Sequence, residues 1–288
     1  MGFLRNIAGS VIALTVAAAV GYGGNVLEYA ATAVGIQWLA ALCYAIPKRD
    51  ERYFDLTGAI THATIVRLAF RVNDEAAGWR GQLLTGLVWI WCCRLGLFLY
   101  WRILERGEDS RFAEIRTNAL RFFSVWTIQG LWVFLTDLPV LLSIAHGHHS
   151  AAANPFDLVG GLLWVVGFVL EALADWQKTQ FRHVPSNKGK FISTGLWAYS
   201  RHPNYLGEIL MWIAIYIIVF PSLAADWKLQ LLAAISPAFV TLLLTTVSGI
   251  PLLEKQGDDR WGKTKEYQQY KARTSVLLLL PQRKLKSA

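Results

Sequence analysis

Eight apolar stretches dominate this sequence, and each is close to the length that crosses a lipid bilayer as a helix. A helix needs about 20 apolar residues to span the hydrocarbon core. The chain has 288 residues and is 54% hydrophobic, which is more apolar than soluble domains usually are. We therefore expect an all-α integral membrane protein, a multi-span bundle of seven or eight transmembrane helices. The expected spans are residues 6–22, 26–46, 55–71, 82–101, 122–145, 157–175, 204–220 and 230–250.

The basic residues are distributed unevenly between the two ends of these helices. If the chain starts in the cytoplasm and alternates, the cytoplasmic segments hold 23 of the 28 Lys and Arg residues, and the opposite segments hold 3. This bias follows the positive-inside rule, so we expect both termini in the cytoplasm. The first stretch could be a cleaved signal peptide, but a second apolar run follows at once, which favours an uncleaved helix. The +8 charge fits membrane orientation better than a nucleic-acid surface.

Residues 191–212 change from a basic loop to an apolar helix at the sequence Arg-His-Pro-Asn. Pro203 suits the first turn of a helix, where its missing N–H is no loss. Asn204 and Glu208 then lie on one face of that helix. A carboxylate in lipid needs a partner or a ligand, so this face is a candidate site. The alternative is a hydrogen bond between helices that only holds the bundle together.

A polar stripe precedes this region, on a helix that leaves the membrane. Together with two basic residues further on, Lys190 and Arg201, the stripe could hold a phosphorylated ligand through charge-assisted contacts. The alternative is a solvated face of salt bridges. No G-x-G-x-x-G or G-x-x-x-x-G-K motif occurs, so a nucleotide would not be held in the Rossmann or P-loop manner. The stripe consists of Glu171, Asp175, Lys178 and Arg182.

Charged residues also interrupt two earlier spans. Asp55 and His62 share one face of the span 55–71, which should look towards a cavity rather than lipid. Arg94 lies near the middle of the span 82–101, where a cation needs a partner. That partner could be Asp55 or a bound ligand. The first option would be a fixed ion pair that braces two helices.

Cysteine and histidine patterns carry less information. Three cysteines lie inside apolar segments, and we expect them to be buried thiols without disulfides. Three histidines occur in a short loop with no carboxylate beside them, so we interpret them as a polar loop and expect no metal site. These residues are Cys43, Cys92 and Cys93, and His146, His148 and His149.

Five motifs together point to a known family. They are RGEDSRF, ADWQKTQFR, LWAYSRHPNYLGEI, SGIPLLEK and WGKTKEYQQYKART, within the range from about Asp55 to Pro281. In combination they resemble the DUF1295 proteins, relatives of the steroid 5-alpha-reductases. The run RHPxYxGE alone also resembles isoprenylcysteine and phospholipid methyltransferases. The family resemblance implies a helical membrane reductase whose C-terminal helices hold NADPH. Hydride would pass to a carbon–carbon double bond conjugated to a carbonyl in a lipid-soluble substrate.

The resemblance also implies which residues hold the cofactor. Glu171, Asp175 and Arg182 match the acidic or amide residue, the Asp and the Arg on the helix before the basic loop, although Glu171 replaces the usual Asn. Lys190 matches the loop cation. The full set that we expect at the cofactor is Glu171, Asp175, Lys178, Arg182, Lys190, Trp197, Tyr199, Arg201, His202, Asn204, Tyr205, Glu208, Glu254, Lys263 and Tyr267.

The substrate end departs from the steroid reductases. In those enzymes, a Glu on an early helix and a Tyr on a later helix are understood to polarise the substrate carbonyl. Here Arg94 stands at the Tyr position, and no Gln-x-x-Glu pair is evident. Asp55, His62 and Arg94 are therefore the expected catalytic residues. Arg94 would stabilise an enolate oxygen, because a fixed cation lowers a barrier at which negative charge develops. The resemblance therefore does not imply that the substrate is a steroid.

A second hypothesis is a membrane methyltransferase that uses S-adenosylmethionine, with Arg201, His202, Tyr205 and Glu208 at the cofactor. The polar stripe and Lys190 favour the reductase, since three phosphates need cations and a sulfonium cofactor does not. A non-enzymatic lipid-binding or scaffold protein is a third possibility. The number of ionisable residues near one end of the helices argues against it.

We expect a single membrane domain over residues 1–288, with N-terminal helices in 1–46, a substrate-cavity half in 55–145 and a cofactor half in 157–288. The C-terminal tail would be a cytoplasmic flap, an interfacial amphipathic helix, or both. The expected partners are the bilayer and a lipophilic small molecule, and no nucleic acid. We expect a monomer in a bacterial inner membrane or the endoplasmic reticulum, with its cofactor site on the cytoplasmic side.

Overall fold

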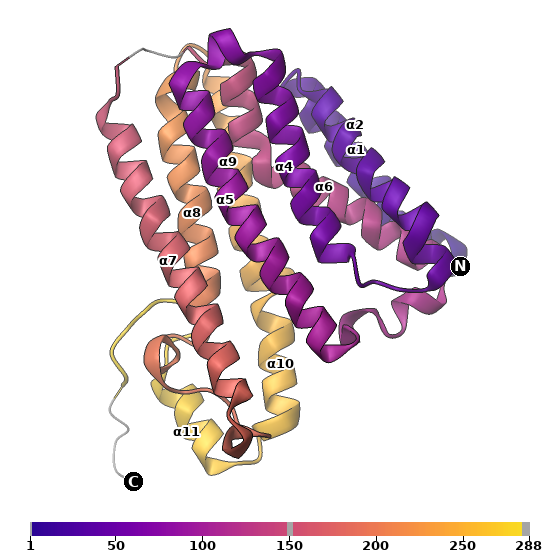
Figure 1. The fold of residues 1–288 in the computed structure, drawn as a ribbon, viewed down its shortest axis with the longest axis vertical. Helices are drawn as coiled ribbons and strands as arrows, with labels where there is room; N and C mark the ends of the chain where they lie inside the picture. The colour runs from indigo at the N-terminus through magenta and orange to yellow at the C-terminus, as the bar shows by residue number, and fades with distance from the viewer. Residues whose placement is uncertain (1, 149–151, 284–288) are drawn as a thin grey trace. The chain divides into compact units, whose positions relative to one another are not determined.

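The structure is a computed structural model that describes residues 2–148 and 152–283 (Figure 1). Its regular elements in that part of the chain are helices, and no strand forms there; Ser200 and Ser275 make one isolated bridge. Helices suit a chain this apolar, because each satisfies its own backbone hydrogen bonds where water is absent. The all-α prediction is confirmed.

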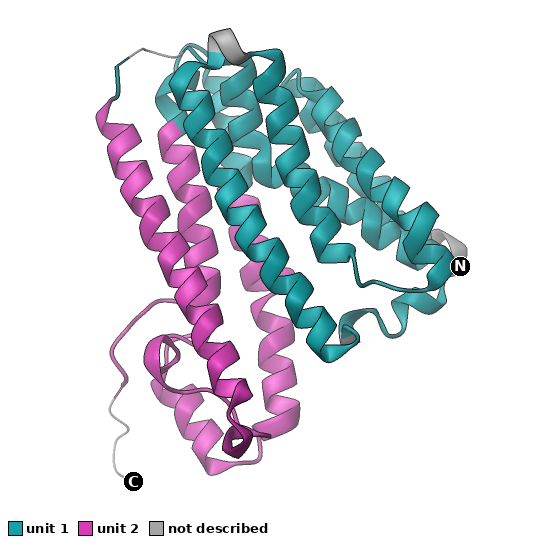
Figure 2. Ribbon diagram, in the orientation of Figure 1, with its two compact units in different colours: residues 1–153, 219–236 teal, residues 154–218, 237–288 magenta. Residues whose placement is uncertain are grey.

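The chain divides into two compact units (Figure 2). Unit 1 comprises Met1–Ala153 and Val219–Ser236, and unit 2 comprises Asn154–Ile218 and Pro237–Ala288. The helix α9 (Trp227–Leu242) therefore contributes to both units, and the division falls at Pro237 inside it. A proline within a helix removes one backbone hydrogen bond, which makes this a natural place for the helix to change partners.

Unit 1 is built around α6, which packs against α1, α2, α4 and α5. Trp126, Phe134 and Leu138 of α6 are fully buried. Polar contacts also join the helices, as in the hydrogen bond of 2.8 Å from Ser10 Oγ to Ser124 Oγ. The bounds are α1 (Gly2–Gly23), α2 (Leu27–Ala40), α3 (Ile46–Lys48), α4 (Phe54–Val72), α5 (Asp74–Arg106) and α6 (Ala119–His146), with a π-helical turn at Ala41–Ala45.

Unit 2 begins with a well-defined helix start. The side chain of Asn154 accepts from the backbone of Phe156 and Asp157, and Asp157 accepts from the backbone of Asn154, which forms a capping box. The further helices are connected by a loop over residues 184–202 and by a π-helical turn at Leu243–Val247. The bounds are α7 (Pro155–His183), α8 (Pro203–Val219), α10 (Ile250–Trp261) and α11 (Lys265–Arg273).

Six helical segments in the described part of the chain are long and apolar enough to cross a membrane. They contain six of the eight expected spans, and the other two, 6–22 and 55–71, correspond to α1 and α4. The helix α4 is less apolar because it carries Asp55, Arg67 and Arg71 within 19 residues. The six segments are Leu27–Lys48, Ala77–Arg106, Ala119–His146, Pro155–His183, Pro203–Leu223 and Trp227–Trp261. The cytoplasmic position of both termini stays a prediction.

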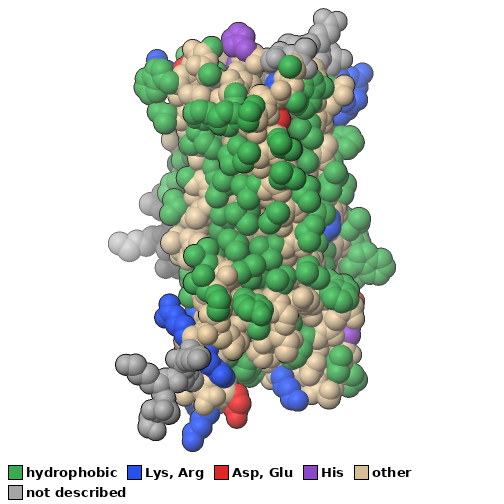
Figure 3. Space-filling view, turned by 90° about the vertical axis from the view of Figure 1, so that its left-hand side faces the viewer, with side chains coloured by type: hydrophobic (Ala, Val, Ile, Leu, Met, Phe, Trp, Pro, Cys, Tyr) green, Lys and Arg blue, Asp and Glu red, His purple; other side chains and the backbone are tan. Residues whose placement is uncertain are grey.

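A stripe of apolar side chains on α7 faces outwards. Leu158 is 65% exposed and Leu162 60%, and Val166 and Val169 continue the same face. The view in Figure 3 is covered mainly by hydrophobic side chains, with Lys and Arg side chains mainly near its two ends. Such a surface would be costly in water and is typical of helices that contact lipid. The arrangement agrees with a bilayer environment.

The expectation for the cysteines is partly wrong. Cys92 is buried, but Cys43 and Cys93 are exposed at the protein surface; all three are free thiols. An apolar side chain on a spanning helix can face lipid instead of the protein core, so an apolar sequence context does not by itself indicate burial in the protein.

Two glycines allow α7 and α8 to approach closely. A methyl group added at Gly167 would lie 2.7 Å from the carbonyl oxygen of Gly207, and one added at Gly207 would lie 2.7 Å from the backbone nitrogen of Glu171. Small residues at such crossings let backbones pack where a larger side chain would separate them.

We predict that Gly167→Ala destabilises the protein by about 1–3 kcal/mol, because the added methyl overpacks the crossing. Gly161→Ala is the matched control, since a methyl there meets nothing within 4 Å. Thermal unfolding in detergent should show a lower Tm for the first variant and an equal or higher Tm for the second. Equal Tm values for the two variants would contradict the close crossing.

Candidate functional site

A pocket in unit 2 gathers basic residues from three segments of the chain, and we call it the basic pocket. The helix α7 contributes Lys178 and Arg182 from its last turns, and α10 contributes Arg260. The connecting loop adds Lys190 and Arg201. Against these five cations stands one carboxylate, Glu254. The other lining residues are Phe181, Phe191, Ile192, Trp197, His202, Leu253, Gln256, Gly257, Trp261, Tyr267 and Tyr270.

Glu254 ties three segments of this pocket together. Its Oε2 lies 3.2 Å from Arg201 Nη2 and 3.1 Å from Lys271 Nζ, and its Oε1 lies 2.9 Å from His202 Nε2. The Lys271 ammonium also contacts Asp258 at 2.6 Å. Ionic contacts of partly buried groups are stronger than exposed ones, because solvent screens them less. The carboxylate therefore fastens the loop before α8 and the helix α11 to α10.

His202 is held neutral at this point. Burial lowers the pKa of His202, and the contact with Glu254 opposes that shift without cancelling it. A neutral ring whose Nε2 faces a carboxylate carries its proton on Nε2, which donates to Glu254. The Nδ1 atom is then an acceptor, and it is buried without a hydrogen-bond partner. Tyr205 stacks on the ring at 5.7 Å between centroids.

An aromatic wall closes the pocket on the side of α11. The ring of Phe191 lies 5.0 Å from that of Tyr267 and 5.3 Å from that of Tyr270. Tyr270 donates to the carbonyl oxygen of Trp197 at 2.7 Å. Gly257 makes room for this wall, since any side chain at that position would collide with the hydroxyl of Tyr267. Flat aromatic surfaces of this kind suit the face of a heterocyclic base.

The loop that carries Lys190 and Arg201 is anchored to α7. Trp197 donates from Nε1 to the carbonyl oxygen of Ala174 at 3.0 Å, and the backbone of Leu196 donates to Gln177 Oε1 at 2.9 Å. Lys178 lies over the Trp197 ring at 4.3 Å, a cation–π contact. The cations of the loop and of α7 are thereby brought to one hollow.

Eight of the expected cofactor residues line the basic pocket, and the other seven do not. Asp175 and Asn204 meet beside it, with Asn204 Nδ2 donating to Asp175 Oδ1 at 3.2 Å. Glu171 and Glu208 are buried on α7 and α8, whereas Tyr199 and Lys263 are exposed. The lining residues are Lys178, Arg182, Lys190, Trp197, Arg201, His202, Glu254 and Tyr267; the others are Glu171, Asp175, Tyr199, Asn204, Tyr205, Glu208 and Lys263.

Arg260 was not among the residues expected at the cofactor. It lies on the helix α10, on which Leu253, Gly257 and Arg260 recur at helical spacing and line the pocket. A search for helical periodicity beyond Pro251 would have found this face.

Unit 1 contains a buried histidine–aspartate pair. His62 Nδ1 lies 2.9 Å from Asp137 Oδ2, and the two side chains are 1% and 0% exposed. Trp91 and Trp132 meet the His62 ring edge to face, at 5.0 and 4.9 Å. Asp137 was not among the expected site residues, although an aspartate inside an apolar span is itself a signal of function.

The other two expected catalytic residues lie elsewhere in unit 1. Asp55 pairs with Arg111 at 3.5 Å, so the structure does not form the brace between Asp55 and Arg94 that the sequence left open. Arg94 lies on α5, with its Nε and Nη2 atoms buried. In the loop that follows α5, Arg116 reaches Glu51 at 3.2 Å and Glu108 at 2.7 Å.

No cluster of metal-ligating side chains occurs among the residues that the structure describes. In the histidine loop, His146 Nε2 contacts the carbonyl oxygen of Gly24 at 2.9 Å. His149 lies outside the described residues.

Comparison with known proteins assigns the family. The sequence model of "Protein of unknown function (DUF1295)" matches residues 43–274, which is most of the chain. The chain belongs to the DUF1295 family. This match confirms the family resemblance that the five motifs indicated. The matched range contains every residue that lines the basic pocket.

Relatives of this DUF1295 protein have different names. An uncharacterized protein of Schizosaccharomyces pombe is 27% identical over 187 residues, 55% of this chain and 53% of the relative. A probable O-methyltransferase of Ustilaginoidea virens is 40% identical over 115 residues, 33% of this chain and 40% of the relative. A Delta(14)-sterol reductase of Gallus gallus is 33% identical over 81 residues, 24% of this chain and 13% of the relative.

The DUF1295 chain thus spans about half or less of each of these relatives. No solved structure matches it significantly.

The pKa of His202 leads to a prediction for acid stability. Because burial lowers this pKa, the unfolded chain binds the proton more readily, and stability falls as the pH drops below the unfolded value of about 6.5. Between pH 7.5 and 5.5 the Tm of the wild type should fall more steeply than that of His202→Gln, which cannot titrate. If the Tm of the two proteins fell equally with pH, His202 would have the same pKa in the folded and the unfolded chain, which would contradict the prediction.

Proposed function

We propose that this DUF1295 protein is a membrane-embedded, NADPH-dependent reductase that acts on an activated carbon–carbon double bond in a lipophilic substrate. The observation that carries this proposal is the basic pocket, where five cations face one carboxylate beside an aromatic wall. The relative named as a sterol reductase supports the same reaction class.

The chemistry of the lining residues fits NADPH. Its three phosphates need several cations, and Arg182, Lys190 and Arg260 are available on three different segments of the pocket. Arginine suits this role because its planar fork binds phosphate in a bidentate manner. The rings of Trp261 and Tyr267 would offer a stacking surface to the adenine. When bound, the nicotinamide would supply the hydride.

In unit 1, residues of the chain would handle the carbonyl and the proton. Hydride addition to the β carbon of an enone leaves negative charge on the carbonyl oxygen, which a fixed cation or hydrogen-bond donor stabilises. Arg94 and His62 are the candidates. Asp137 would hold the His62 ring in one orientation, as a carboxylate does for other catalytic histidines. A proton delivered by His62 would then complete the reduction.

A second candidate function is an S-adenosylmethionine-dependent methyltransferase of the isoprenylcysteine or phospholipid type. The observation in its favour is the 40% identity to a probable O-methyltransferase. The charge of the basic pocket argues against it, because a sulfonium cation would be repelled by five cations and attracted by one carboxylate.

The small molecule that co-purifies with the protein in mild detergent would separate these two functions. A mass of NADPH or its oxidised form, with absorbance in the reduced-nicotinamide band, supports the reductase. S-adenosylmethionine or its demethylated product would replace that proposal by the methyltransferase. The cytoplasmic position of the pocket belongs to the proposal as well, since only the positive-inside bias supports it.

We predict that Lys190→Ala and Arg182→Ala each weaken NADPH binding about tenfold, because each removes a charge-assisted contact of about 1.5 kcal/mol or more. Lys188→Ala is the matched control: it lies in the same loop, is exposed, and does not line the pocket. Fluorescence titration with NADPH measures all three affinities. An equal loss in the Lys188 variant would mean that the net charge of the surface, and not the pocket, sets the affinity.

We further predict that Arg94→Leu and His62→Gln reduce turnover about 100-fold or more and leave NADPH affinity nearly unchanged. The reason is that neither residue lines the basic pocket. NADPH oxidation with a 3-keto-4-ene steroid as the probe substrate measures turnover, and fluorescence titration measures binding. If a variant kept wild-type turnover, the replaced residue would have a structural role and no catalytic one.

A further inference from the structure

An apolar segment without helix or strand follows α11, Ser275–Pro281, and we call it the leucine segment. It forms neither helix nor strand, and its side chains are unusually exposed for their type. Leu278 is 54% exposed, Leu280 45% and Val276 41%. A run of exposed leucines outside a helix or strand needs an apolar partner or an apolar medium.

The leucine segment is held in place by its backbone. Ser275 accepts from the backbone of Arg201 at 2.9 Å, and the carbonyl oxygen of Leu277 accepts from Ser200 Oγ at 2.7 Å. The backbone of Leu280 donates to Tyr199 at 3.3 Å. These bonds fix the segment to the loop before α8, so the leucines are presented outwards as part of the fold.

The loop that holds the leucine segment lies near the end of a membrane span. Trp197 of this loop is bonded to Ala174 of α7, as described above. The 20 helical residues after Pro155 end at about the level of Ala174. At about 1.5 Å per residue they are about 30 Å long, which is the thickness of the hydrocarbon core. Trp176 is 58% exposed there, and exposed tryptophan is typical of the boundary between lipid and water.

We propose that the leucine segment is an interfacial anchor that inserts its side chains at the boundary between lipid headgroups and acyl chains. It cannot cross the hydrocarbon core, because a backbone that forms no helix would leave polar groups unsatisfied there. Charge identifies anionic lipid as the partner: Arg283 follows the segment, and Lys284 and Lys286 come next in the sequence. Basic residues beside inserted leucines are attracted to anionic headgroups.

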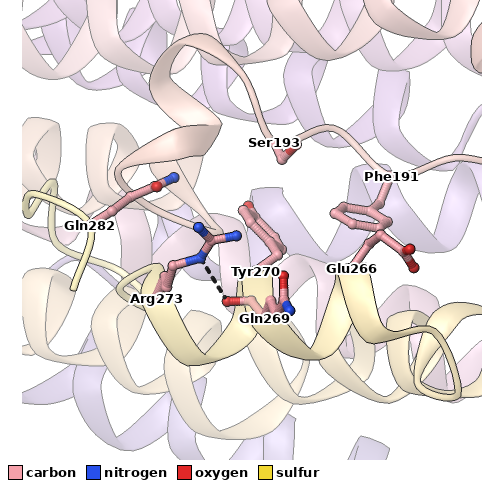
Figure 4. A pocket seen from close by; sticks show the side chains of 7 residues that line it. All are labelled: Phe191, Ser193, Glu266, Gln269, Tyr270, Arg273 and Gln282. Atoms are coloured by element: carbon pink, nitrogen blue, oxygen red, sulfur yellow. Dashed lines mark hydrogen bonds between the residues drawn. The ribbon is translucent and has the colours of Figure 1, made fainter. Parts of the chain in front are cut away.

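The anchor is connected to α11, the helix that carries two rings of the aromatic wall. The backbone of Arg283 donates to the carbonyl oxygen of Arg273 at 3.0 Å, which joins the end of the anchor to the last residue of α11. Figure 4 shows a second, polar hollow at this junction, where Arg273 Nε contacts the carbonyl oxygen of Gln269 at 3.4 Å. The hollow shares Phe191 and Tyr270 with the basic pocket. Lipid contact would therefore position one wall of that pocket.

The test places an environment-sensitive fluorophore at Leu279→Cys, with the native cysteines replaced, in nanodiscs of phosphatidylcholine and phosphatidylglycerol. Gln268→Cys on the exposed face of α11 is the matched control. Lipids that carry a quencher near the headgroup should quench the probe at position 279 several-fold more than the probe at 268. They should also quench it more than lipids that carry the quencher near the acyl end.

Equal quenching at positions 279 and 268 would overturn the proposal. So would strongest quenching from the acyl end, or a buried probe that no lipid quenches, which would indicate a protein partner.

The unaltered protein provides a second measurement that does not depend on the cysteine replacements. After photolysis with a lipid that carries a diazirine near its headgroup, trypsin releases the peptide Thr274–Arg283, which contains the whole leucine segment, and the peptide Glu266–Lys271 of α11. Lipid adducts should concentrate in the first peptide, and equal labelling would overturn the proposal. Neither measurement involves NADPH, so the anchor and the proposed reductase activity can fail separately.

Discussion

The carboxylate of Glu254 is the contact on which the organisation of unit 2 depends. It joins Arg201, His202 and Lys271, which come from the loop before α8 and from α11, to the helix α10. Without it, the cations of Arg201 and Lys271 would repel one another at close range. With it, the same groups have a fixed position, and the other cations of the basic pocket remain for a ligand. The electrostatic character of the pocket thus rests on one anion placed among many cations.

The electrostatic arrangement of unit 1 is different. An ionisable group inside an apolar span is costly, and the fold offsets this cost by placing His62 and Asp137 against each other between two tryptophans. The pair is fully enclosed, whereas Asp55 lies nearer the surface and contacts Arg111. Two acidic residues of similar sequence context therefore differ in environment, and that difference makes Asp137 the more interesting of the two for proton chemistry.

The periodicity of apolar residues predicted the helices well, because a spanning helix must be apolar over a fixed length. The polar stripe predicted Lys178 and Arg182 at one hollow, because their spacing on one helix fixes their relative position. Contacts between helices were harder to predict. The partner of His62 is 75 residues away in the sequence, and no local pattern indicates which acidic residue will meet it. Tyr199 and Lys263 were expected at the same hollow, but they are exposed and do not line it.

The absence of a side chain at Gly257 has a consequence for how this pocket could have diversified. The phenol of Tyr267 occupies the volume that a β-carbon at position 257 would take. The two positions are therefore linked through shared space, and an increase in size at one requires a decrease at the other. In related chains, the width of the slot available to a planar ligand would follow from this pair of residues more directly than from any of the charged groups.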